Sequence, residues 1–343
     1  MATAFNGFLR PIAWRGKTPR RRDVDGQVIF RKDRRVQSFD GTTIAYTVRG
    51  KRGPWVALVP GFSCPDNFWR YLVPELEKRY RVIIWDLRGL GLSGTPYAPG
   101  YRATRLSPAH FTIESYVRDL EAILDAERVQ KVALLGHSMG GQIILETYRE
   151  SPKRVWGLAF VTAPYESPLR TFYGRDFTSL FHGLNLTINL VPRPAVLLWR
   201  ALFAVNTAVP HALAKLGRAL GPNAKHEDMA PYYRHMAYLD PLVMLKMAEA
   251  MRAHSAADVL PTVKVPALVL AATSDTFTPL DLARRMAKTI PRAELMEIEG
   301  AGHGAIIEKP DEVNSAVVDF LKRHAPRARR RAKAASSPRS RGR

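Results

Sequence analysis

The stretch KVALLGHSMGGQIILE, residues 131–146, decides how the rest of the chain is interpreted. An uninterrupted apolar run ends at Gly136, a single serine follows at Ser138, and a helical pattern starts directly after two more glycines. Uninterrupted apolar runs are typical of parallel strands that are covered on both faces. The spacing G-x-S-x-G therefore predicts a sharp strand-to-helix turn that presents the Ser138 hydroxyl at the carboxyl end of a sheet.

A serine hydroxyl is too weakly acidic to attack an ester unaided, so the turn needs a nearby base and a carboxylate that orients it. LVLAATSD ends an apolar run at Asp275, and IEGAGHGAIIEKP carries His303 in a glycine-flanked loop after the last expected strand. Both positions follow the carboxyl ends of expected parallel strands, where ligands of open α/β sheets bind. Asp258 and Asp281 compete for the acid role, but neither lies at the end of a strand.

Strand and helix patterns alternate along most of the chain. The segments 34–39 and 42–50 flank Asp40-Gly41 and predict a β-hairpin. Further strands are expected at PWVALVPGF, RVIIWDLRG, KVALLGHS, VWGLAFVTAP, ALVLAATSD and AELMEIEGAGH, with helices between them, including 66–80 and 112–128. This alternation predicts an α/β fold with a doubly wound, mostly parallel sheet.

Residues 164–256 break this rhythm, because they contain Leu/Ala-rich, Pro-punctuated helical segments and no convincing strand. We therefore expect a helical cap at 164–256, inserted into a core domain formed by 36–163 and 257–324. The apolar cap sequence with scattered basic residues is explained by core helices of the cap, and a lipid-facing lid is the open alternative.

Composition sets the class of protein. A chain of 343 residues with 46% hydrophobic residues has enough apolar surface for a large core. The single cysteine, Cys64, excludes an internal disulfide and any cysteine-built metal site, and favours a reducing cytoplasm. Neither a signal-peptide core nor a membrane-span-length apolar run is present, so we expect a soluble, or at most membrane-peripheral, protein.

The net charge of +21 is concentrated at the two ends of the chain. Residues 1–35 carry ten Lys and Arg against three Asp, and residues 322–343 carry ten with no acid. We expect a disordered basic arm at 1–35 and a disordered basic tail at 325–343. The simplest interpretation is that both ends are solvated tails. The alternative is that they contact an anionic membrane or another polyanion. The sequence contains no specific nucleic-acid-binding motif.

With DLRGLGLS at 86–93, ATSDTFTP at 272–279 and GAGH at 300–303, the chain resembles the α/β-hydrolase superfamily from about residue 36 to 324, least clearly in the cap. The resemblance implies a catalytic triad of Ser138, Asp275 and His303, without a metal or cofactor. It also implies an oxyanion hole formed by the backbone N–H groups of Phe62 and Met139. The His-Gly pair that usually precedes the second donor is Pro60-Gly61 here.

Serine at the turn, where related dehalogenases and epoxide hydrolases carry aspartate, favours hydrolysis of carboxylic esters through an acyl-enzyme. Phe68, Trp69 and Trp85 suggest an apolar substrate pocket for small-molecule esters or lipids. Two alternatives would share the triad: a cofactor-free haloperoxidase or perhydrolase, and a carbon–carbon bond hydrolase. A third alternative is a non-enzymatic binding module. We interpret His137 as a packing residue and His254 as a residue of the cap or the surface.

Overall fold

The computed structural model describes residues 30–96, 108–168 and 206–326, together with Ser179, Gly183 and Leu198. Most of both basic arms and most of 169–205 in the expected cap therefore lie outside the described residues. The expected boundaries of the cap stay a prediction for this reason.

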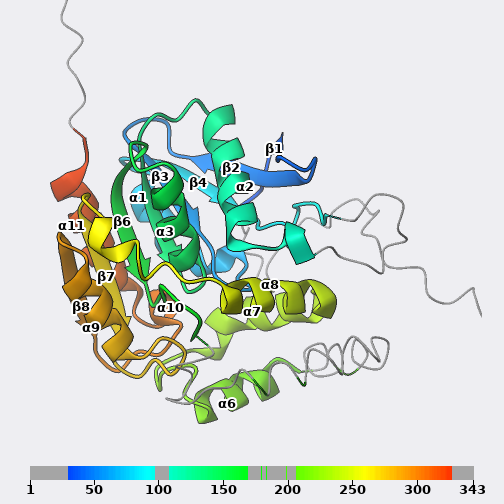
Figure 1. Cartoon of the computed structure of the whole chain (residues 1–343). Helices are drawn as coiled ribbons and strands as arrows, with labels where there is room; N and C mark the ends of the chain where they lie inside the picture. Colours follow the sequence, from blue (N-terminus) through cyan, green and yellow to red (C-terminus); the bar gives the residue numbers. More distant parts are fainter. Residues whose placement is uncertain are drawn as a thin grey trace, which may run out of the picture.

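One eight-stranded sheet forms the centre of the described chain, with strand order β1-β2-β4-β3-β5-β6-β7-β8 (Figure 1). Pairs β1–β2 and β2–β4 are antiparallel, and all other pairs are parallel. The predicted doubly wound, mostly parallel sheet is confirmed. The strands are β1 Arg34–Gln37, β2 Thr43–Arg49, β3 Trp55–Val59, β4 Arg81–Trp85, β5 Val132–His137, β6 Val155–Val161, β7 Ala267–Ala272 and β8 Ala293–Ile298.

The sheet separates two hydrophobic layers, because successive side chains of each strand point to opposite faces. In β3, Ala57 and Val59 pack into one layer with α2, α3 and α9, whereas Val56 and Leu58 pack into the other with α1, α10 and α11. These helices are α1 Val73–Leu76, α2 Ile113–Ala126, α3 Gly140–Glu150, α9 Leu280–Thr289, α10 Ala305–Glu308 and α11 Pro310–His324.

Two expectations about local structure need correction. The single helix expected at 66–80 is broken into a 3-10 turn, Asp66–Trp69, and the short helix α1, because Pro74 fits only in the first turn of a helix. The expected arm 1–35 extends too far, since β1 begins at Arg34. Lys32 is buried and forms ion pairs with Asp66 and Asp86, which anchors this part of the chain to the core.

Three helices lie beyond the carboxyl ends of the parallel strands: α6 Ala208–Leu216, α7 His226–Tyr238 and α8 Pro241–Ala253. Pro210, Tyr232 and Met251, one from each helix, line the same cavity as Ser138. In Figure 1, α6 is the outermost of the three. Among the described helices, none has both the length and the apolar character that crossing a membrane requires.

Candidate active site

Ser138 occupies a strained turn between β5 and α3. Its φ is +53°, in the left-handed region that residues with a Cβ seldom adopt. A Cβ atom at Gly136 would lie 2.5 Å from the Gly140 carbonyl oxygen, and one at Gly140 would overlap the Val59 carbonyl oxygen. Both glycines are therefore required by close backbone approach, as the G-x-S-x-G spacing predicts.

The structure brings Ser138, His303 and Asp275 together in one hydrogen-bonded chain. His303 Nε2 lies 2.8 Å from Ser138 Oγ, and His303 Nδ1 lies 2.8 Å from Asp275 Oδ2. A neutral imidazole in this position donates Nδ1–H to the carboxylate and accepts the serine proton at Nε2. The arrangement is able to convert a hydroxyl into a nucleophile.

The Asp275 carboxylate is fixed by the loop that follows it. The backbone N–H groups of Phe277 and Thr278 donate to Oδ1 at 2.8 and 3.0 Å, and the Thr278 hydroxyl donates to Oδ2. The Asp275 side chain is fully buried. Thr278 was missed at the sequence level, although an aspartate that accepts from backbone N–H groups two and three residues later is a common turn.

The two competing aspartates lie away from this site. Asp258 is 67% exposed and pairs with Arg149, and Asp281 is 79% exposed beside Arg284. Neither is hydrogen-bonded to His303, whose Nδ1 faces Asp275.

The loop after β3 lies directly against Ser138. A Cβ at Gly61 would lie 2.7 Å from the Cβ of Ser138, so only glycine fits there. The backbone N–H groups of Phe62 and Met139 donate to no acceptor among the described residues. Two unused donors beside Ser138 are what an oxyanion hole requires.

A cavity of about 480 Å³ opens at Ser138 and His303. Its walls come from the loop after β3, the cap helices and the loop after β7, and include Phe62, Phe68, Leu213, Tyr232 and Phe277. Among the described residues, no Lys, Arg, Asp or Glu lines it. The cavity therefore suits an uncharged, largely apolar molecule.

Of the three aromatic residues assigned to the pocket from the sequence, only Phe68 lines the cavity. Trp69 and Trp85 are 1% and 2% exposed and belong to the hydrophobic layers on opposite faces of the sheet. The assignment of these two tryptophans to the pocket is wrong, because both side chains are used in packing. Tyr232 and Tyr233 of the cap line the cavity instead, and no sequence motif marks them.

His137, interpreted from the sequence as packing, also lines the cavity. Its Nδ1 lies 3.7 Å from Cys64 Sγ, and its Nε2 lies 3.3 Å from the His303 carbonyl oxygen. Burial and the neighbouring His303 lower the pKa of His137 to about 3, and burial raises the pKa of the Cys64 thiol to about 12. Both side chains are therefore neutral near pH 7.

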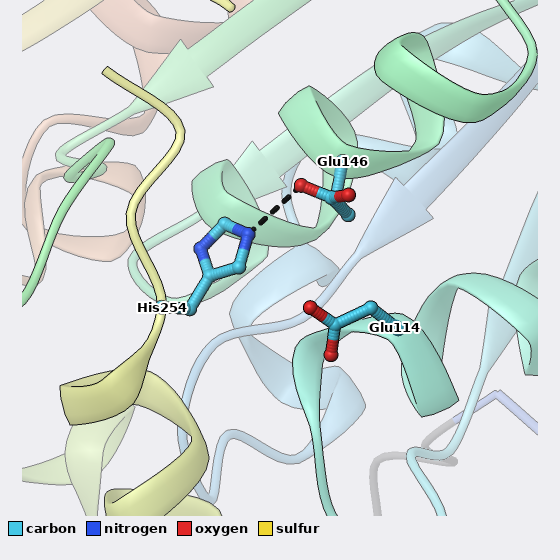
Figure 2. Close-up of side chains that lie close together, drawn as sticks. All are labelled: Glu114, Glu146 and His254. Carbon is cyan, nitrogen blue, oxygen red and sulfur yellow. Dashed lines mark hydrogen bonds and ion pairs between the residues drawn. The ribbon is translucent and has the colours of Figure 1, made fainter. Parts of the chain in front are cut away.

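Glu114, Glu146 and His254 form a second cluster of polar side chains (Figure 2). Their ligand atoms lie within 4.8 Å of one another, which is the spacing of a metal site. However, Glu146 Oε2 already accepts from His254 Nε2 and from Arg149 Nε, each at 3.0 Å. The hydrogen bond between His254 and Glu146 ties the end of α8 to α3, and Glu114 lies beside this pair.

Comparison with known proteins identifies the fold family. A family model described as alpha/beta hydrolase fold matches residues 54–310, which is most of the chain. The chain belongs to the alpha/beta hydrolase fold family. Ser138, Asp275 and His303 all lie within the matched residues.

Its relatives carry the names of different hydrolases. The chain is 26% identical over 278 residues to "Putative carbamate hydrolase RutD" of Azorhizobium caulinodans, covering 80% of this chain and 93% of the relative. It is 24% identical over 269 residues to the 2-hydroxy-6-oxononadienedioate/2-hydroxy-6-oxononatrienedioate hydrolase of a Pseudomonas species, covering 77% and 85%. The esterase EaEST from Exiguobacterium antarcticum has the same fold, with a TM-score of 0.67, 20% identity and coverage of 84% and 98%.

Proposed function

We propose that this alpha/beta hydrolase cleaves uncharged carboxylic esters with apolar acyl groups through an acyl-enzyme on Ser138. The observation that carries the proposal is the chain of hydrogen bonds from Ser138 through His303 to Asp275 at the wall of an apolar cavity. Ester chemistry needs a nucleophile, a base and a site for the developing oxyanion, and this site offers all three.

In the proposed mechanism, Ser138 Oγ attacks the ester carbonyl carbon while His303 Nε2 accepts its proton. The carbonyl oxygen becomes an oxyanion beside the unused N–H groups of Phe62 and Met139. His303 then gives the proton to the leaving alcohol as the carbon–oxygen bond breaks. A water molecule, deprotonated by His303, releases the acid and restores Ser138.

The cavity lining supports neutral substrates over charged ones. A dioate, as named for the Pseudomonas relative, carries two carboxylates at neutral pH, and a buried carboxylate needs a cationic or hydrogen-bonding partner. The described lining offers no Lys or Arg. Carbon–carbon bond hydrolysis of such a dioate is therefore less well supported than hydrolysis of a neutral ester.

Two 4-nitrophenyl esters of similar size test the proposal. We expect 4-nitrophenyl butyrate to be hydrolysed with a kcat/KM at least about 100-fold above that of 4-nitrophenyl hemisuccinate, whose carboxylate would meet no Lys or Arg in the described lining. Ser138→Ala should abolish both activities. Equal rates for the two esters would contradict the proposed substrate class, and full activity of Ser138→Ala would contradict the mechanism.

Esters from acetate to palmitate then measure the size of the acyl site. Haloperoxidase, perhydrolase and carbamate-hydrolase activities would use the same Ser138. Each activity is measured with its own substrate, and its kcat/KM is compared with those of the esters. A preference for any of these over every ester would overturn the proposal of ester hydrolysis.

A further inference from the structure

Helix α6 exposes apolar side chains to solvent. Val209, Leu213 and Leu216 are spaced by four and three residues, so they lie on one face of the helix, and they are 50%, 54% and 82% exposed. The other exposed residues of this helix are Ala208 and Ala212. A surface helix in water normally carries polar and charged residues on this side, so the apolar face indicates a partner.

The opposite side of α6 covers the catalytic cavity. Pro210 and Ala214 line the cavity, and His211 Nδ1 lies 3.3 Å from the Tyr233 hydroxyl of α7. Leu213 both lines the cavity and is half exposed. Among the described helices, α6 is therefore the one that separates this side of the cavity from the outside, in agreement with its outermost place in Figure 1.

The charged residues of α6 and of the loop that follows it are positive, and the nearest acidic residues in the sequence are Glu227 and Asp228 in the first turn of α7. Residues 206–226 contain Lys215, Arg218 and Lys225 and no Asp or Glu. Arg218 and Lys225 are exposed, just beyond the end of the helix. An apolar helix face next to basic side chains complements an anionic lipid surface, where acyl chains receive the apolar groups and phosphates receive the cations.

We propose that α6 docks the protein on an anionic phospholipid bilayer. Val209, Leu213 and Leu216 enter the boundary between headgroups and acyl chains, and Arg218 and Lys225 contact the phosphates. The part of the cavity wall that contains Leu213 then faces the bilayer. This docking goes beyond the proposed ester hydrolysis and does not depend on the role of Ser138.

Vesicle co-sedimentation of the full chain tests the apolar contact. The variant Val209→Ser/Leu216→Ser removes two exposed side chains and leaves Leu213, which lines the cavity, intact. We expect its partition onto equal mixtures of phosphatidylcholine and phosphatidylglycerol to fall at least about tenfold, because less apolar surface is buried. The control Leu295→Ser, 37% exposed on β8, should bind like the wild type. Unchanged binding of the double variant would overturn the proposal, since both basic arms are still present in it.

Two further arms test the charge and the alternative partner. Arg218→Asn/Lys225→Ser should weaken binding to the mixed vesicles about tenfold or more, and Asn tolerates the φ of +52° at residue 218. Wild-type binding that is equally tight on pure phosphatidylcholine would overturn the anionic preference. A wild-type dimer that Val209→Ser/Leu216→Ser dissociates, without any vesicle binding, would show that a second copy covers α6 and overturn the proposal.

Ser138→Ala separates docking from catalysis. The variant should sediment with mixed vesicles like the wild type, whether or not Ser138 is the nucleophile. Loss of vesicle binding in Ser138→Ala, in a protein that keeps its wild-type unfolding transition, would contradict docking through α6 alone.

Discussion

His137 Nε2 lies 3.3 Å from the backbone carbonyl oxygen of His303, and the Thr162 hydroxyl donates to the same oxygen at 3.0 Å. The residue that precedes the proposed nucleophile therefore helps to hold the loop that carries the proposed base. The contact requires a proton on Nε2 of a neutral His137 ring, which leaves Nδ1 facing Cys64 Sγ. Ser138 and His303 are thus positioned relative to each other by more than their own hydrogen bond.

This buried ring predicts a loss of stability in acid. The pKa of His137 is lowered to about 3 by burial and by His303, from an ordinary value of 6.5. Below about pH 6.5 the unfolded chain binds a proton that the native chain does not, so the free energy of unfolding falls by about 1.4 kcal/mol per pH unit from this group. Urea unfolding between pH 7 and pH 5 should show this slope in the wild type and a correspondingly smaller slope in His137→Gln. Equal slopes in the two proteins would contradict the buried, neutral histidine.

Gly61 provides a steric test of the proposed oxyanion hole. A Cβ there would lie 2.7 Å from the Ser138 Cβ, so the loop must move away from Ser138 in Gly61→Ala. We expect kcat/KM to fall by about 100-fold or more, because the loss of one oxyanion donor has an effect of this size. Gly157→Ala is the matched control, since its Cβ would meet Phe320 at an ordinary 3.6 Å. Wild-type activity of Gly61→Ala would show that this loop takes no part in the reaction.

Thr278→Val tests whether the hydrogen bond from Thr278 to Asp275 contributes to activity. Thr278→Val removes the hydroxyl that donates to Asp275 Oδ2 and keeps the shape of the side chain. We expect kcat to fall by about tenfold with little change in KM, since a hydrogen bond to a charged group contributes about 1.5–3 kcal/mol. In the control, Thr276→Val, the lost hydroxyl donates only to the Arg218 carbonyl oxygen at the surface. A similar loss in both variants would mean that the loop as a whole, and not the contact with Asp275, is responsible.

Arg88 tests the stability of the fold rather than its chemistry. Its guanidinium is fully buried, bonds both carboxylate oxygens of Asp119 at 2.5 and 2.8 Å and contacts Asp40 at 2.8 Å. Arg88→Met leaves the Asp119 carboxylate buried without its partner, which should lower the free energy of unfolding by about 3–5 kcal/mol. The exposed Arg118→Met serves as control. Chemical denaturation that places Arg88→Met within about 1 kcal/mol of the wild type would contradict this account.

The sheet and the three hydrogen-bonded side chains were predictable because their signals are local. Strands β5 and β7 are almost entirely apolar, and Ser138 and Asp275 follow them within three residues. His303 lies in a glycine-flanked loop after β8, which also contains Glu294 and Glu297. The motif DLRGLGLS at 86–93 was recognisable in the sequence, but the partners of Asp86 and Arg88 did not follow from it. Lys32 and Leu92 contact Asp86, whereas Arg88 pairs with residues far along the chain.

The cavity walls were not predictable, because they depend on which elements meet in space. Trp85 lies on β4, whose pleat directs it into one hydrophobic layer, and Trp69 lies in the 3-10 turn and packs into the layer on the other face of the sheet. Tyr232 reaches the cavity from α7, and its hydroxyl lies 3.4 Å from Ser63 Oγ, more than 160 positions earlier in the chain. The pairing of His254 with Glu146 likewise joins the end of the cap to α3.

The most direct test of the central claim is the site of covalent labelling. A fluorophosphonate reacts with an activated serine by forming an oxygen–phosphorus bond and releasing fluoride, and the labelled peptide is identified by mass spectrometry. We predict one label per chain, on Ser138, absent in Ser138→Ala and formed far more slowly in His303→Ala. An unlabelled Ser138, in protein that still hydrolyses 4-nitrophenyl butyrate, would contradict the account.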